Sequence, residues 1–224
     1  MNRMPKIALI VLLCLSPCWP QVAKEANKDY QTPEGRRRVA STLDDPHRQE
    51  ALKANELIAR LGIKPSSVVA DVGTGTGFML PYFSEAVGSA GRVIAEDIQQ
   101  DFLDKAAARI QSQHLSNVST VLGGDKNPNL PEGQLDLVFM LDVYHHFDYP
   151  SDMLAHFSRA LKAEGRLAVA DYYRHRRGPQ DGDMSGHIRA DRDEVIREIE
   201  SNGFRLESKS DNGSQQYLLI FAKK

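Results

Sequence analysis

The chain has 224 residues, of which 41% are hydrophobic and 26% are charged. This balance is typical of a folded globular protein and excludes wholesale disorder. Lys and Arg number 28 against 30 Asp and Glu, a formal net charge of −2, so no basic excess favours nucleic acid as a partner. The two cysteines are too few for a disulfide scaffold and lack the spacing of a structural zinc site.

The first 20 residues have the pattern of a secretory leader. Arg3 and Lys6 precede an apolar run over 7–15, which has the length of a signal-peptide core and is too short to span a bilayer. We therefore predict that residues 1–20 are a signal peptide or N-terminal leader and that the protein is exported to the periplasm, with no membrane insertion beyond the leader. A leader that stays uncleaved would leave the protein cytoplasmic or anchored to a membrane.

Residues 21–66 are polar and helical in pattern, and we expect them to form an N-terminal helical cap on a main domain over 67–224. Asp45 followed by Pro46 is a typical helix start, and Gly62 stands where a helix-ending glycine belongs. Apolar residues recur between these signals at near-helical spacing: Leu52, Leu57, Ile58 and Leu61.

Downstream, short apolar runs alternate with helical patterns. We predict strands over 68–72, 92–97, 118–122, 135–141 and 165–171, and helices over 77–87, 99–113, 150–161 and 191–202. Two further apolar runs, 204–209 and 216–222, flank the hairpin signal Asp211-Asn-Gly-Ser214, which would place an antiparallel strand at the close. This alternation predicts right-handed β-α-β units and an α/β fold with a mainly parallel sheet.

The clearest motif is a glycine-rich turn after the first predicted strand. Asp71, Gly73, Gly75 and Gly77 occupy every second position. The spacing fails the dinucleotide fingerprint in both frames, and no Gly-Lys-Ser/Thr marks a phosphate-binding loop. A carboxylate ahead of the first glycine would repel a pyrophosphate, but it can hold an ammonium group or support the turn. Glycines here would let a ligand approach the backbone at the carboxyl edge of the sheet.

This motif and three later segments resemble the class I S-adenosylmethionine-dependent methyltransferases. The later segments are Glu96-Asp97 at the end of the second strand, Gly123-Gly-Asp125 after the third, and Asp142-Val-Tyr-His-His146 after the fourth. The last is close to a subset of small bacterial members that often carry a leader. The resemblance covers roughly 47–222 and implies a Rossmann-like, doubly wound, seven-stranded sheet with an antiparallel last strand and helices on both faces.

The resemblance also implies the cofactor, S-adenosyl-L-methionine, and the residues that bind it. Asp97 would accept the ribose hydroxyls, whereas the side chain of Glu96 should point to the opposite face. Asp125 would contact the adenine or stabilise its own loop. The expected cofactor-binding residues are Asp71, Gly73, Thr74, Gly75, Gly77, Asp97, Ile98, Asp125 and Asp142.

Methyl transfer requires alignment, desolvation and, for some acceptors, removal of a proton. His145 and His146 stand where the fourth strand should open over the sulfonium, and histidine is a natural base near neutral pH. Only one of two adjacent residues can face the cleft. We expect it to be His145, with Tyr144 lining the methyl path; a role for all three in shaping the pocket alone remains open.

A metal-assisted reaction is a weaker hypothesis than methyl transfer without a metal. Asp142 and Asp171 end neighbouring strands and could hold Mg²⁺, but a third ligand is missing, so we expect no metal. Tyr173 and His187, in the insert over 172–189, could line the site of a small-molecule acceptor. The leader motivates another function, an exported nucleoside-binding protein that has kept the pocket and lost catalysis.

Overall fold

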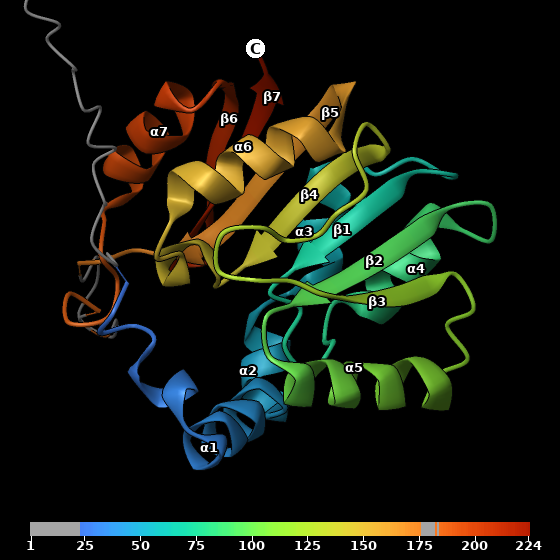
Figure 1. The fold of residues 1–224 in the computed structure, drawn as a ribbon, viewed down its shortest axis with the longest axis horizontal. Coiled ribbons are helices and arrows are strands. Elements are labelled where there is room, and N and C mark those ends of the chain that lie inside the picture. Colours follow the sequence, from blue (N-terminus) through green and yellow to red (C-terminus); the bar gives the residue numbers. More distant parts are fainter. Residues whose placement is uncertain (1–22, 176–181, 183) are drawn as a thin grey trace, which may run out of the picture.

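The structure is a computed structural model that describes residues 23–175, 182 and 184–224, so the predicted leader lies outside the described residues. A seven-stranded sheet forms its centre, in the order β3-β2-β1-β4-β5-β7-β6, with helices on both faces (Figure 1). The strands are β1 (Val68–Val72), β2 (Arg92–Asp97), β3 (Val118–Leu122), β4 (Leu135–Leu141), β5 (Leu161–Tyr172), β6 (Phe204–Asn212) and β7 (Gln216–Lys223). The first five strands run parallel and β7 is antiparallel to both of its neighbours, which confirms the predicted fold class.

Two layers of helices enclose the sheet. The helices are η1 (Lys28–Gln31), α1 (Pro33–Leu43), α2 (Pro46–Ala51), α3 (Ala54–Leu61), α4 (Leu80–Val87), α5 (Gln100–Ser112), η2 (Tyr144–His146), α6 (Pro150–Ala160) and α7 (Arg192–Ser201). Apolar side chains of α6 and α7 pack on one face of the sheet in one core, and those of α3, α4 and α5 pack on the other face in a second core. The central strands are therefore buried on both sides, which explains their nearly continuous apolar sequences.

Several helix and strand boundaries differ from the prediction. The chain between Pro46 and Gly62 forms two helices, because Lys53 adopts a left-handed conformation with φ 50° that ends α2 and redirects α3 onto the sheet. Helix α4 begins at Leu80 instead of residue 77, because Gly77 has φ 81°, which a right-handed helix does not accept. Strand β5 begins earlier, at Leu161, and its register with β4 shifts before the expected strand start.

The connections place a crevice at one edge of the sheet. From β1 the chain moves outward to β2 and β3, then returns to β4 and continues in the other direction to β5. The adjacent carboxyl ends of β1 and β4 thus form a topological switch point, where α/β proteins bind ligands. Helices α1 and α2 lie at the same edge (Figure 1). Within the described residues, no helix has the length and apolar character needed to cross a membrane.

Candidate active site

A cavity of about 270 Å³ lies at the carboxyl edge of β1, β2 and β4. Six of the nine expected cofactor-binding residues line it, namely Gly73, Gly75, Asp97, Ile98, Asp125 and Asp142. The other three, Asp71, Thr74 and Gly77, are not among its lining residues. The sequence motifs therefore meet at one cavity, although some of the expected residues line it and others do not.

The glycine turn shapes one wall of the cavity. Gly73 and Gly75 have φ values of 66° and 55°, a region that residues with side chains rarely adopt. A Cβ atom at Gly73 would come within 2.5 Å of the Val143 side chain, and one at Gly75 within 2.7 Å of Leu43. Only glycine allows the neighbouring segments to approach this closely while leaving the backbone open to a ligand.

Asp71 supports this turn from behind. Its side chain is only 2% exposed and accepts a hydrogen bond from the Thr74 hydroxyl at 2.7 Å. Burial raises the pKa of Asp71 to about 7. Of the two roles that the sequence left open, holding an ammonium group or supporting the turn, the contacts of Asp71 are those of a turn support.

Asp97 links the second strand to the glycine turn. Its Oδ2 accepts a hydrogen bond from the Gly75 backbone N–H at 3.0 Å, and its Oδ1 accepts one from Gln99 at 2.8 Å. Burial raises the pKa of Asp97 to about 6. A carboxylate has about four acceptor positions, so each oxygen can accept a further hydrogen bond from a ligand in the cavity.

Glu96 differs from the prediction. It also lines the cavity, and its side chain reaches the glycine turn, where its Oε2 accepts a hydrogen bond from the Gly73 backbone N–H at 3.3 Å. Burial, followed by the charge of Asp97, raises the pKa of Glu96 well above its usual range. Its Oε1 has no hydrogen-bond partner within the described part of the chain.

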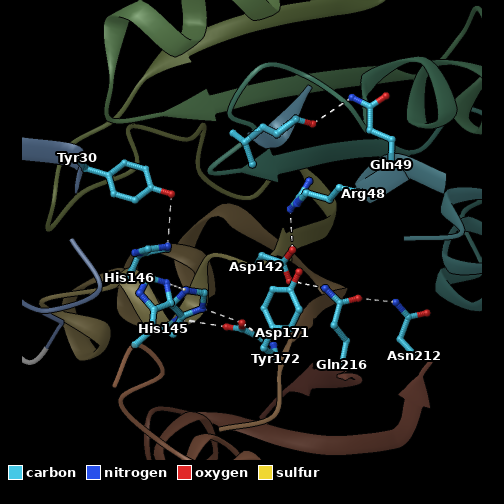
Figure 2. Close-up of polar contacts among 12 residues, drawn as sticks. Tyr30, Arg48, Gln49, Asp142, His145, His146, Asp171, Tyr172, Asn212 and Gln216 are labelled. Carbon is cyan, nitrogen blue, oxygen red and sulfur yellow. Dashed lines mark hydrogen bonds and ion pairs between the residues drawn. The ribbon is translucent and has the colours of Figure 1, made fainter. Parts of the chain in front are cut away.

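Asp142 ties the N-terminal helices to the sheet, as Figure 2 shows. Its Oδ2 lies 2.7 Å from Nη2 of Arg48 in α2, and its Oδ1 accepts from the side-chain amide of Gln216 in β7. Burial raises the pKa of Asp142 to about 6, and the Arg48 charge opposes this shift. Asp171 instead pairs with His145 at 2.7 Å. The two carboxylates considered for Mg²⁺ are thus each held by other side chains.

The two adjacent histidines have exchanged the expected positions. His146 lines the cavity, whereas His145 is buried against Asp171 and is not a lining residue. The 3-10 turn η2 causes this, since it directs consecutive side chains to different sides. Burial, and then the neighbouring charges of His145 and His187, lower the pKa of His146 well below its usual range. The imidazole on the cavity wall is therefore neutral near pH 7.

Tyr144 also lies away from the expected methyl path. Its side chain is fully buried in the core beneath α6 and α7, and its hydroxyl donates to Oε1 of Glu198 at 2.5 Å. Arg189 forms an ion pair with the same Glu198 carboxylate at 2.6 Å. Tyr144 anchors the start of η2 and so positions the histidines that follow it.

The geometry agrees with comparisons to known proteins. Residues 70–169 match the family described as the methyltransferase domain. A solved structure, a SAM-dependent methyltransferase from Aquifex aeolicus, covers 81% of this chain and 95% of its own with a TM-score of 0.76 and 27% identity. Residues 70–169 thus match a methyltransferase domain in sequence, and the chain is similar over most of its length to a SAM-dependent methyltransferase.

Two curated relatives, both methyltransferases, are similar to about half of this chain. Nocamycin O-methyltransferase from Saccharothrix syringae is 29% identical over 116 residues, which are 52% of this chain and 41% of that protein. A ubiquinone/menaquinone biosynthesis C-methyltransferase from a Marinomonas species is also 29% identical over 116 residues, 51% of this chain and 46% of that protein. The chain thus spans less than half the length of these relatives.

The N-terminal segment supplies a further wall of the cavity, and none of its lining residues was predicted from the sequence. Asn27, Tyr30, Gln31, Leu43 and Arg48 all line it. The Tyr30 ring packs edge-on against Phe102 and against His146, with centroids 6.0 Å and 4.8 Å apart. These residues lie in a polar stretch whose composition is the same as that of a solvated helix, so no local signal distinguished them.

Proposed function

We propose that this chain is an S-adenosylmethionine-dependent methyltransferase that acts on a small molecule. The observation that carries the proposal is the cavity at the switch point, which has the open backbone of Gly75 and the carboxylate of Asp97 on the same wall. Two backbone N–H groups hold that carboxylate in place with acceptor positions left for two ribose hydroxyls. Glycines at 73 and 75 let the side chains of Val143 and Leu43 pack directly against the turn that forms this wall.

We further propose that the methyl acceptor binds between the N-terminal segment and η2. Tyr30, Arg48 and His146 face the cavity from this side. Their packing would exclude water from the sulfonium and align the acceptor, which are the main requirements of an in-line displacement. One of the two relatives is named an O-methyltransferase and the other a C-methyltransferase. For this chain we propose an acceptor that can lose a proton beside His146.

Calorimetric titration with S-adenosylmethionine and S-adenosylhomocysteine tests cofactor binding. We expect Asp97→Ala to weaken both by about 10- to 100-fold, since hydrogen bonds to a charged group contribute about 1.5–3 kcal/mol. Asp104→Ala is the matched control, because Asp104 is an exposed carboxylate on α5 whose side chain accepts a hydrogen bond from Gln100, one turn away on the same helix. Absence of binding heat in the wild type, or equal losses in both variants, would contradict the proposal.

Formation of S-adenosylhomocysteine with a panel of hydroxylated, aminated and carbon-acid acceptors tests catalysis. We expect turnover with at least one acceptor and its loss in Asp97→Ala. Tight cofactor binding without turnover of any acceptor would contradict the catalytic part of the proposal and leave a binding protein.

We also propose that the protein is exported, on the basis of the basic and apolar pattern over 1–20. Expression of the full chain, followed by fractionation and N-terminal sequencing, tests this. A periplasmic protein that begins after Cys18 or Ala23 is the expected result, and an intact Met1 in the cytoplasmic fraction would refute export.

A further inference from the structure

Three histidines converge beside the cavity. His145 and His146 are adjacent in η2, and His187 lies in the turn that precedes α7. One ring nitrogen of each lies within 4.8 Å of the others. The Nε2 atoms of His145 and His187 are 3.2 Å apart, and the ring centroid of His146 lies 4.1 Å and 5.3 Å from those of the other two. Two separate segments of the chain thus bring three potential ligand nitrogens together.

The partners of His145 leave its Nε2 free to act as a ligand. Its Nδ1 lies 2.7 Å from Oδ1 of Asp171, and its backbone N–H donates to Oδ2 of the same residue at 3.1 Å. Because a carboxylate only accepts hydrogen bonds, Nδ1 carries the hydrogen and Nε2 presents its lone pair toward His187. A carboxylate behind an imidazole is the arrangement that orients metal-ligating histidines.

His146 is oriented in the same way by an amide. The Nδ2 of Asn27 donates to the backbone carbonyl of His146 at 2.9 Å and to Asp148 at 3.3 Å. This leaves Oδ1 of Asn27 to accept from Nδ1 of His146 at 2.9 Å. The Nε2 of His146 therefore also presents a lone pair, on the side of the ring where the Tyr30 hydroxyl lies at 3.5 Å.

We propose that His145, His146 and His187 bind a divalent transition-metal ion of the Zn²⁺ class. The 3.2 Å between two Nε2 atoms is close to the spacing of about 3.4 Å that a tetrahedral ion imposes on nitrogens bound at about 2.1 Å. A set of imidazoles favours Zn²⁺ over Mg²⁺ or Ca²⁺, which select oxygen ligands. Three protein ligands leave one tetrahedral position open, as in catalytic zinc sites.

The open position suggests a substrate class, and this step rests on the proposed methyltransferase function. His146 lines the cavity, so an acceptor hydroxyl there could bind the ion and release its proton to solvent near neutral pH. The acceptor oxygen then forms a bond to the methyl carbon while the carbon–sulfur bond breaks, and the electron pair of that bond stays on sulfur. The acceptor is thus a hydroxyl-bearing small molecule, and His146 acts as a ligand instead of a free base.

Metal binding to the purified full chain tests the site without reference to activity. After chelation and removal of the chelator, Zn²⁺ is titrated and its stoichiometry measured by elemental analysis, and Co²⁺ is added separately to record its visible spectrum. We expect one Zn²⁺ per chain and the intense bands of tetrahedral Co²⁺. His187→Ala should lower Zn²⁺ affinity by at least 100-fold, and Asp171→Asn by about 10- to 100-fold. His47→Ala, at an exposed histidine on α2, should change nothing.

Two results would overturn the proposal. One is Zn²⁺ uptake that is equal in the wild type and in His187→Ala, and the other is a Co²⁺ spectrum without tetrahedral intensity in the wild type. Either result would mean that the short distance between His145 and His187 reflects a direct hydrogen bond and not a shared metal site. The spectrum of the wild type decides the matter even where a variant fails to fold. Cofactor titration of the same sample separates the two proposals, since binding of S-adenosylhomocysteine without metal refutes only this site.

Discussion

Replacement of the buried Asp71 carboxyl should change how the stability of the protein depends on pH. Asp71 is 2% exposed, and burial raises its pKa from 3.8 to about 7. A carboxyl with a raised pKa holds its proton more tightly in the folded state, so its stabilising contribution is present at low pH and is lost as the pH rises through about 7. Asp71→Asn keeps the shape and the acceptor for Thr74 but removes the titration.

The size of the effect follows from the interval between the assay pH and the raised pKa. At pH 5 the carboxyl is about two units below a folded-state pKa of about 7, and one unit corresponds to about 1.36 kcal/mol. The wild type should therefore lose about 2.7 kcal/mol between pH 5 and pH 8 from this group alone. The free energy of unfolding of Asp71→Asn, relative to the wild type, should rise by that amount over the same interval.

Urea denaturation without added cofactor, followed by far-ultraviolet circular dichroism, measures this difference at each pH. Fluorescence is unsuitable because the single tryptophan, Trp19, lies in the predicted leader. Asp104→Asn, at an exposed position, is the control and should track the wild type at every pH. A stability difference between Asp71→Asn and the wild type that stays constant from pH 5 to pH 8 would refute the reasoning.

Three further predictions concern the cavity walls. Arg48→Met leaves the Asp142 carboxylate, which is 8% exposed, without its ion-pair partner. In urea denaturation this variant should lower the free energy of unfolding by about 3–5 kcal/mol. The control Arg38→Met, at a side chain that is 62% exposed, should change the free energy of unfolding by less than about 0.5 kcal/mol. Gly75→Ala forces a side chain into a conformation with φ 55° and should cost about 1–2 kcal/mol of stability and weaken S-adenosylhomocysteine binding in calorimetry. Because the pKa of Asp97 is raised to about 6, affinity for S-adenosylhomocysteine should be about tenfold lower at pH 5 than at pH 7.5; a pH-independent affinity would count against the role given to Asp97.

The sequence predicted the architecture because the buried strands have distinctive patterns. The apolar runs around Val69 and Phe139 are central strands that are covered on both faces, and the carboxyl ends of these strands carry the glycine turn and Asp142. Each of these features depends on residues that are close together in the sequence, so a short stretch of sequence is enough to predict it. The break at Lys53 was missed because its left-handed conformation follows from how α3 packs, and a lysine gives no local sign of it.

The site could be predicted only in part, since it also depends on contacts between distant segments. Which of His145 and His146 faces the cavity is decided by the 3-10 geometry of η2, and Tyr144 is drawn into the core by Glu198 in α7. The contribution of Tyr30 comes from a segment more than a hundred residues away from η2 in the chain. Neither spacing nor composition encodes such long-range packing.

Ala23, the first residue that the structure describes, and Lys224 lie at opposite edges of the sheet, and this determines where the protein can be modified for experiments. The backbone N–H of Ala23 donates to Asp148, a residue that lines the cavity, at 3.0 Å. By contrast, β7 runs antiparallel to β5, so Lys224 emerges at the edge remote from the ligand site (Figure 1). An affinity handle, dye or immobilisation tether therefore belongs after Lys224, because a group attached at Ala23 would lie beside the cavity wall that Asp148 forms.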